Sequence, residues 1–268
     1  ACFQSWRNGA ETHIERALTA APCFTMAHVL SAYLCLCSRD VVRVRKASQA
    51  LARATTLSSN ARERLHIAAI GAALSDDLAT VKALLDTLLQ QFPRDVLALQ
   101  VGHVLDYITG DSEHMSARVS AVLPVWSKAL PGYHAVLAMR AFALVENADY
   151  QSAADTALQA LEFEPFDARA HHALAHVYEM AGDAAGGVTW MQQRIGFWSN
   201  DTTVATHCWW HWALFHLSQG KPADALALYD QRIRADRSSA VADMIDASAL
   251  LWRIDLLGAS TGARWHEL

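Results

Sequence analysis

Glycine and proline are scarce in this chain of 268 residues, which contains 12 and 6 of them respectively. Folds rich in strands and tight turns need more of both residues, because these two residues supply the turn conformations. Charged residues make up only 18% of the chain and hydrophobic residues 53%, so apolar side chains for a core are plentiful. The composition therefore favours a fold built from helices.

Long apolar runs and dense basic clusters are also missing. No apolar stretch reaches the length of about 18 residues that a membrane-spanning helix needs, and no signal peptide is visible. The net charge is −5, and the most basic segment is the short Arg43-Val44-Arg45-Lys46. A nucleic-acid groove or an anionic membrane surface needs a broader basic stripe. We therefore expect neither nucleic acid nor a membrane as a partner.

The cysteines lack the pattern of a disulfide framework or a zinc knuckle. Their number is odd and no two of them are spaced as Cys-x-x-Cys. Cys35 and Cys37 are two residues apart, which points them to different sides of a helix. We expect all five to be free thiols in a reducing compartment.

Helix-pair units recur in the carboxy-terminal half of the chain. The first unit runs from residue 131 to 165, the second begins near residue 167, and a third follows. Small residues, aromatic residues and helix-ending Gly or Pro take comparable places in them: Ala160 and Pro165, then Ala175, Tyr178 and Gly182, then Ala213, Gly220, Ala225 and Tyr229. Small residues let paired helices approach closely, and the aromatic residue fills the gap between repeats. This is the pattern of a tetratricopeptide repeat (TPR).

The amino-terminal half has the same organisation in a more degenerate form. Phe92-Pro93-Arg94-Asp95 and Ala21-Pro22 each close a helix pair, and amphipathic segments such as residues 81–89 fill the intervals. We count about six and a half helix pairs by this pattern. The sequence therefore predicts an all-α, TPR-like α-solenoid of antiparallel helix pairs in a right-handed superhelix, forming one domain over residues 1–268.

Histidines recur with the period of the repeat. Six of the 13 are separated by gaps of 31 to 38 residues, and each falls in the predicted first helix of a pair: His28, His66, His103, His134, His172 and His207. First helices line the concave face of a TPR solenoid, which is the usual binding surface. A lone histidine on a helix is, however, more often a half-buried, hydrogen-bonded side chain. Both interpretations stay open for the first four.

Two consecutive first helices carry histidines in pairs. His172, His176 and Glu179 lie within an arc of about 60° on one helix face, at 100° per residue. His207 and His211 are again four residues apart on the next first helix. Neighbouring helices lie about 8–10 Å apart at their axes. We therefore predict that four imidazoles and one carboxylate meet at one place.

Three interpretations of that place compete. The first is a metal site for zinc or iron, with His172, His176, Glu179, His207 and His211 as ligands. The second is a metal-free pocket in which the four histidines are the candidate catalytic bases or hydrogen-bond donors. The third is a buried polar network that fixes how two repeats dock. Spacing alone does not rank these three.

Two further residues are candidates for ligand binding. Trp210 follows His207 on the same helix at a position that flanks the groove, and its ring is suited to stacking on a flat or cationic ligand. Asp246 opens an otherwise apolar helix. It is either an acid of the first turn, favoured there by the helix dipole, or a charge turned inward to the groove.

Several segments together resemble the tetratricopeptide-repeat protein 38 family, whose bacterial members are also called StaR-like. They cover almost the whole chain in order: Arg62–His66, Phe92–Leu99, His172–Met180, His207–Leu214, Tyr229–Asp230, Asp246–Arg253 and Gly262–Trp265. The resemblance implies a cytoplasmic multi-TPR protein that continues past Trp265, so we expect a partial chain without its further carboxy-terminal repeats. It implies no defined reaction. The histidines that the family shares map onto His66, His103, His172, His176, His207 and His211.

Two functions follow from these predictions. The first is a binding scaffold whose concave pocket holds a small ligand or a peptide at the histidine cluster, with His66, His103, Glu179, Trp210 and Asp246 as further ligand-binding residues. The alternative is an enzyme, metal-dependent or not, that uses the same histidines, with a place in specialised metabolism. The hydroxylase role suggested for bacterial relatives has little support here, because the chain lacks the flavin-binding fingerprint, which is Gly-x-Gly-x-x-Gly after a strand.

Overall fold

The computed structural model describes residues 2–38 and 40–268 of the chain. These residues form fifteen α-helices, and their only strand-like pairing is one isolated antiparallel bridge between Arg7 and Thr202. The prediction of an all-α fold is thereby confirmed.

The helices follow one another as pairs joined by short turns, as a TPR-like solenoid requires. A single helix, α1 (Ala10–Ala20), precedes the pairs and another, α15 (Val241–Leu256), follows them. The six pairs between them are α2 (Thr25–Cys37) with α3 (Val41–Thr55), α4 (Ala61–Leu74) with α5 (Leu78–Gln91), α6 (Val96–Ile108) with α7 (Ser112–Val122), α8 (Tyr133–Glu146) with α9 (Tyr150–Phe163), α10 (Ala168–Met180) with α11 (Ala184–Gln193), and α13 (Ala205–Ser218) with α14 (Pro222–Leu228).

Short segments complete the array. The four-residue helix α12 (Ile195–Trp198) joins α11 to α13, and a π-helical turn (Tyr229–Ile233) extends α14. Two 3₁₀ turns lie at Leu123–Val125 and Arg264–Glu267. The predicted count of about six and a half pairs agrees with this order of elements.

Aspartate side chains begin many of the helices. Each accepts a hydrogen bond from a backbone N–H of the first turn, which otherwise has no partner in the helix. The six that do so at the starts of α5, α6, α7, α9, α10 and α11 are Asp77, Asp95, Asp111, Asp149, Asp167 and Asp183. The turn inside a pair is made by a glycine in three cases, since Gly110, Gly182 and Gly220 have φ of 70°, 70° and 71°.

Small residues fill the contacts between helices, as the repeat pattern predicted. Ala160, Ala175, Ala213 and Ala225 are all fully buried, and so is the aromatic Tyr229. Buried alanines let the helix backbones approach closely, and larger side chains such as Trp198 and Phe215 fill the remaining space. The core therefore runs along the array as a series of contacts between neighbouring pairs.

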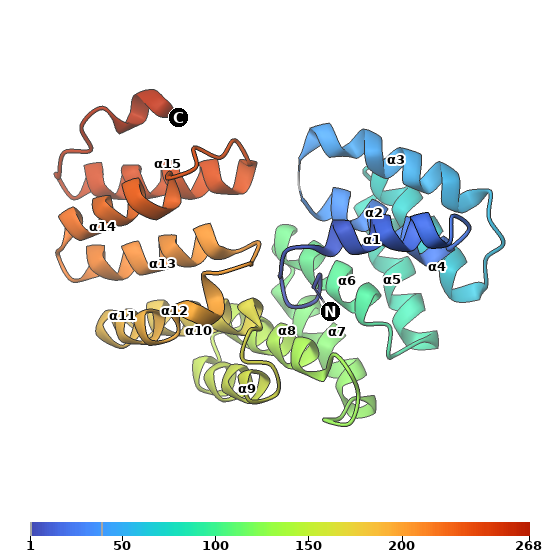
Figure 1. Ribbon diagram of the computed structural model, residues 1–268. Coiled ribbons are helices and arrows are strands. Elements are labelled where there is room, and N and C mark those ends of the chain that lie inside the picture. The colour runs from blue at the N-terminus through green and yellow to red at the C-terminus, as the bar shows by residue number, and fades with distance from the viewer. Residues whose placement is uncertain (1, 39) are drawn as a thin grey trace.

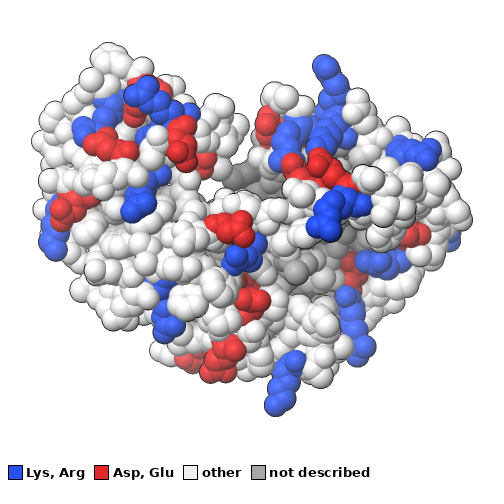
Figure 2. Space-filling model, in the orientation of Figure 1, with Lys and Arg blue, Asp and Glu red and all other residues white. Residues whose placement is uncertain are grey.

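The array follows an open curve (Figure 1). Its two ends, α1–α3 and α13–α15, lie on either side of a notch that the space-filling view shows at the rim (Figure 2), and basic and acidic side chains are interspersed over this face. None of the helices in the described part of the chain combines the length and apolar character that crossing a bilayer requires.

The beginning of the chain lies at the centre of the curve, against first helices (Figure 1). We call residues 2–8 the N-terminal strap. The Gln100 side chain of α6 donates a hydrogen bond to the carbonyl of Phe3 (2.9 Å), and the Ala168 N–H at the start of α10 donates to the carbonyl of Ser5 (3.3 Å). The N–H of Thr203, just before α13, donates to the carbonyl of Trp6 (2.8 Å). The strap thus ties the inner face of α6 to the α10–α13 region.

Candidate metal centre

Helices α10 and α13 bring four histidines together. His172 and His176 lie one turn apart on α10, with ring centroids separated by 4.5 Å, and His207 and His211 lie one turn apart on α13 at 4.7 Å. Across the two helices, the centroids of His176 and His211 are 4.5 Å apart and those of His172 and His207 are 4.9 Å apart. One ring nitrogen of each histidine lies within 4.8 Å of one ring nitrogen of each of the others. We call these four residues the histidine cluster.

The cluster is largely removed from water. His211 is fully buried and His172 is 5% exposed, whereas the His207 side chain keeps 32% of its surface exposed. Burial, reinforced by the neighbouring imidazoles, holds the pKa of His172, His176 and His211 well below the usual range. These rings are therefore neutral at neutral pH, and neutral imidazole is the form that binds a metal ion.

Two ring nitrogens of the cluster lack the partners that buried polar atoms normally have. Whereas Nε2 of His172 and Nε2 of His176 are hydrogen-bonded to each other (3.0 Å), two others have no such contact. Nδ1 of His172 and Nε2 of His211 are buried without a hydrogen-bond partner among the described residues. Buried polar atoms without a partner are costly and call for an explanation. A bound cation that accepts the lone pair of such a nitrogen is one.

Two carboxylates support the cluster from outside. Nδ1 of His211 donates to Oε2 of Glu179 (2.8 Å), and Nδ1 of His207 donates to the carboxylate of Asp246 (2.9 and 3.0 Å). A proton held on Nδ1 in this way leaves the lone pair on Nε2 of the same ring, which is the arrangement around metal-binding histidines. Glu179 therefore contacts a histidine instead of joining the four rings. Of the two placements predicted for Asp246, the structure has the inward one.

Aromatic rings enclose the cluster. Phe142 of α8 stacks on His172 with ring centroids 5.4 Å apart, and Trp210 stacks on His207 at 5.2 Å with an interplanar angle of 13°. Trp6 of the N-terminal strap packs against His172 at 5.5 Å. Trp210 thus flanks the site as the sequence predicted, whereas no pattern in the sequence pointed to Trp6.

The two other predicted ligand-binding histidines lie outside the cluster. His66 is fully buried between repeats, where Nε2 bonds to Asp95 (2.9 Å) and Nδ1 to the Tyr33 hydroxyl (3.2 Å). His103 donates from Nε2 to the carbonyl of Met139 (2.9 Å), and its ring is separated from His172 by the ring of Phe142, which packs against both. Both histidines are buried, hydrogen-bonded side chains, which was the second interpretation of the periodic histidines.

The earlier histidines of the series also have protein partners. His28 bonds through Nε2 to the carbonyl of Pro22 (3.0 Å), and His134 bonds through Nδ1 to Asp167 (2.7 Å). The periodic histidines therefore divide into hydrogen-bonded side chains in α2 to α8 and a convergent group on α10 and α13.

A second group of metal-binding residue types lies on α6 and α7, where Asp106, Asp111 and His114 approach one another. The Lys82 ammonium lies 3.2 Å from Asp106 and 2.7 Å from Asp111, and the Arg118 guanidinium bonds to Asp106 at 2.8 Å. These cations already balance the carboxylates, so this group forms an ion-pair network between two repeats.

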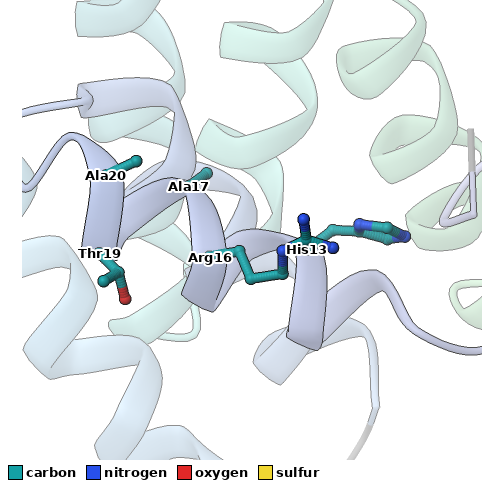
Figure 3. Close-up of a pocket in the computed structure, with 5 residues that line it drawn as sticks. All are labelled: His13, Arg16, Ala17, Thr19 and Ala20. Carbon is teal, nitrogen blue, oxygen red and sulfur yellow. The ribbon is translucent and has the colours of Figure 1, made fainter.

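Two surface hollows lie away from the cluster. The first follows α1 and is lined by side chains of that helix alone, as Figure 3 shows: His13, Arg16, Ala17, Thr19 and Ala20. The second is lined by Arg62, by Val125 and by the segment Phe92–Asp95. Neither contains a residue of the histidine cluster.

No family model matches the chain. Among solved structures, the chain is similar to the crystal structure of MamA protein, with 11% identity and a TM-score of 0.47 over 75% of this chain and 97% of that one. It is also similar to the crystal structure of the P58(IPK) TPR domain, with 11% identity and a TM-score of 0.33 over 90% of this chain and 74% of that one. At these scores the likeness carries no argument about the site, and the helix pairs themselves define the TPR-like fold.

Proposed function

We propose that this protein is a TPR-like binding protein built around a divalent transition-metal ion, which is held by His172, His176, His207 and His211. The observation that carries the proposal is the approach of one ring nitrogen from each histidine to within 4.8 Å of the others. The histidines of the earlier repeats are held by hydrogen bonds to the protein, as His66 and His103 are. The buried Nε2 of His211 has none among the described residues.

The charges around the cluster favour a divalent ion. The four neutral imidazoles contribute no charge of their own. Glu179 and Asp246 each accept a hydrogen bond from Nδ1 of one histidine, so two negative charges lie directly behind the rings. Two carboxylates in this supporting position match the charge of one divalent ion and hold the rings in the metal-binding orientation.

The donor set favours zinc or iron over magnesium or calcium. Imidazole nitrogen suits zinc, copper, iron and nickel, whereas magnesium and calcium are bound through oxygen ligands. The absence of a carboxylate among the four converging groups therefore supports a transition metal. Zinc with nitrogen ligands is the simplest choice, because it accepts four such ligands without redox chemistry.

The surroundings of the cluster support a small ligand over a long peptide. The N-terminal strap already lies along the inner face where a peptide would run, and Trp6 covers His172. A small molecule can reach the metal from the side of the strap, because it needs access only to the edge of the site. The resemblance to the tetratricopeptide-repeat protein 38 family and a cytoplasmic location belong to the same proposal.

An enzyme that uses the same centre is the second candidate. The observation that favours it is the exposure of His207, whose side chain is 32% accessible beside an otherwise buried cluster. This edge gives a substrate a way to the ion. A zinc ion that expands to five ligands, or an iron ion, would keep a position for the substrate beside the four histidines, and such an ion polarises a bound carbonyl or activates water.

Elemental analysis of the purified protein tests the metal proposal. We expect about one zinc or iron per chain in the wild type and none in the His172→Ala/His207→Ala double variant. The matched control is His171→Ala/His216→Ala, which removes one histidine from each of the same two helices outside the cluster and should keep the metal. Absence of metal from the wild type after incubation with zinc and with ferrous iron would remove the proposal.

A further inference from the structure

A buried arginine lies on the same face of α10 as the histidine pair. Arg169 precedes His172 by three residues and His176 by seven, so the three side chains share one side of the helix. Arg169 is 1% exposed. Burial lowers its pKa to about 10, so the guanidinium still carries its charge at neutral pH. The site therefore contains a buried positive charge in addition to the four imidazoles.

This guanidinium has no anionic partner among the described residues. Its Nε and Nη2 atoms are buried without a hydrogen bond. Two acidic groups act on it electrostatically, Asp167 and the thiol of Cys37. Asp167 is engaged elsewhere, because one oxygen accepts the backbone N–H of Arg169 and Ala170 and the other bonds to His134. Burial raises the pKa of Cys37 to about 12, so its thiol is uncharged at neutral pH. A buried charge without a partner is strongly destabilising. Such an arginine is suited to receive an anion from outside.

The two free nitrogens form one edge of the guanidinium. Nε and Nη2 point their N–H groups in parallel, which matches the two oxygens of a carboxylate. The central carbon of the guanidinium lies over the ring of Trp6, 4.3 Å from the ring centroid. This contact leaves the N–H groups of Nε and Nη2 without a hydrogen-bond partner. Trp6 therefore excludes water from one side of the arginine without accepting hydrogen bonds from it.

The same tryptophan connects the arginine to the histidine cluster. Its ring contacts Arg169 on α10 and lies 5.5 Å from the ring of His172. The guanidinium and the cluster thus border the same small region beneath the strap. A divalent ion at the cluster would add positive charge beside Arg169, and an anion between the two would be attracted by both.

We propose that Arg169 binds the carboxylate of a small organic acid through Nε and Nη2, and that a second donor atom of the same acid binds the metal ion at the histidine cluster. The second half of this inference rests on the proposed metal site. The first half, an anion at Arg169, depends only on the guanidinium and its surroundings. The ligand class is a short carboxylic acid with a hydroxyl or carbonyl oxygen close to its carboxylate.

Binding of ¹³C-labelled acetate and glycolate to the zinc-incubated protein, followed by NMR line broadening, tests the proposal. The metal content is measured on the same samples. We expect saturable binding of acetate, and binding of glycolate about ten times tighter, because glycolate adds a hydroxyl oxygen for the metal. Arg169→Gln should weaken both at least tenfold with unchanged metal content. Arg169→Lys, which keeps the charge and loses the paired donors, gives the same test if the Gln variant does not fold.

The matched control is Arg253→Gln, because Arg253 also stacks on a tryptophan beside the cluster, 5.2 Å from the centroid of Trp210, but is exposed. It should bind both acids as the wild type does. If the protein holds no metal, the preference for glycolate disappears while the effect of Arg169 on acetate remains, so a failure of the metal site is recognisable. No saturable acetate binding, or equal binding by the wild type and both Arg169 variants, would overturn the inference.

Discussion

Nδ1 of His211 lies 2.8 Å from Oε2 of Glu179, while Nε2 of the same ring is buried without a partner among the described residues. The carboxylate acts on one nitrogen and thereby determines what the other can do. With the proton on Nδ1, Nε2 presents a lone pair toward the other histidines of the cluster.

Removal of the charge of Glu179 should weaken metal binding without breaking the fold. Glu179→Gln keeps a hydrogen-bond acceptor for His211 but loses the negative charge that supports the ion. We expect metal affinity to fall by about tenfold, the lower end of the range for partners in this position. Competition with a chromophoric chelator measures it. Glu162→Gln, which changes an exposed glutamate on α9, should leave the affinity unchanged; equal affinities for both variants would contradict the role given to Glu179.

Asp95 joins two repeats in addition to beginning a helix. It is 4% exposed, accepts the N–H groups of Leu97 and Ala98 at the start of α6, and bonds to His66 and Arg62 of α4. Although burial alone would raise it, the hydrogen bonds from His66 and Arg62 lower the pKa of Asp95 to about 2.

Asp95→Ala should therefore cost more than the loss of a helix cap. We expect a decrease of about 3 kcal/mol in the free energy of unfolding, because the substitution leaves His66 and Arg62 without their partner. Asp149→Ala removes only the cap of α9, formed with the N–H of Ser152, and should cost about 1 kcal/mol. Urea denaturation of both variants checks the difference. Equal losses would mean that the contact between repeats contributes nothing measurable.

His103 should make the stability of the protein depend on pH. Burial, together with the charges of Arg169 and Arg118, lowers its pKa to about 3, whereas an unfolded histidine titrates near 6.5. Between these values the unfolded chain binds a proton that the folded chain does not. The free energy of unfolding therefore falls as the pH falls from about 6.5 toward 3.

His103→Gln should lessen this dependence. Glutamine retains a donor for the carbonyl of Met139 but does not titrate. Urea denaturation between pH 7 and pH 5 should show a decline shallower by up to about 1.4 kcal/mol per pH unit than in the wild type. The other buried histidines are present in both proteins, so their contributions cancel in the comparison. Parallel declines would contradict a neutral, buried His103.

The sequence predicted the fold and the meeting of the four histidines for the same reason. The spacing of residues along a helix determines which side chains share a face, so His172 with His176 and His207 with His211 had to form pairs. The small residues at Ala175 and Ala213 indicated that α10 and α13 are the first helices of consecutive repeats. Two pairs on neighbouring first helices then converge without further information.

The contacts around the cluster could not be predicted from helical spacing. Which acid supports which ring depends on how each helix is rotated in the superhelix, and a helical period does not contain that angle. Glu179 was therefore grouped with the ligands, and the placement of Asp246 stayed undecided. Trp6 was missed because the strap reaches α10 and α13 through backbone hydrogen bonds across almost 200 residues of sequence, as the contact between Trp6 and Thr203 illustrates.

The histidines of the earlier repeats show the converse. His66 and His103 share the period of the series and lie in first helices, but buried partners on the neighbouring helices hold their rings away from the cluster. Periodicity locates a residue on a helix and does not identify its partner.

X-ray absorption spectroscopy of the zinc-incubated protein shows whether the four histidines hold the ion, because it reports the atoms bound to it. We expect a shell of four nitrogens at about 2.0–2.1 Å, with the outer scattering of imidazole rings, that loses imidazole scattering in His172→Ala/His207→Ala. A shell made mainly of oxygen, or an imidazole contribution unchanged by the double substitution, would contradict this expectation.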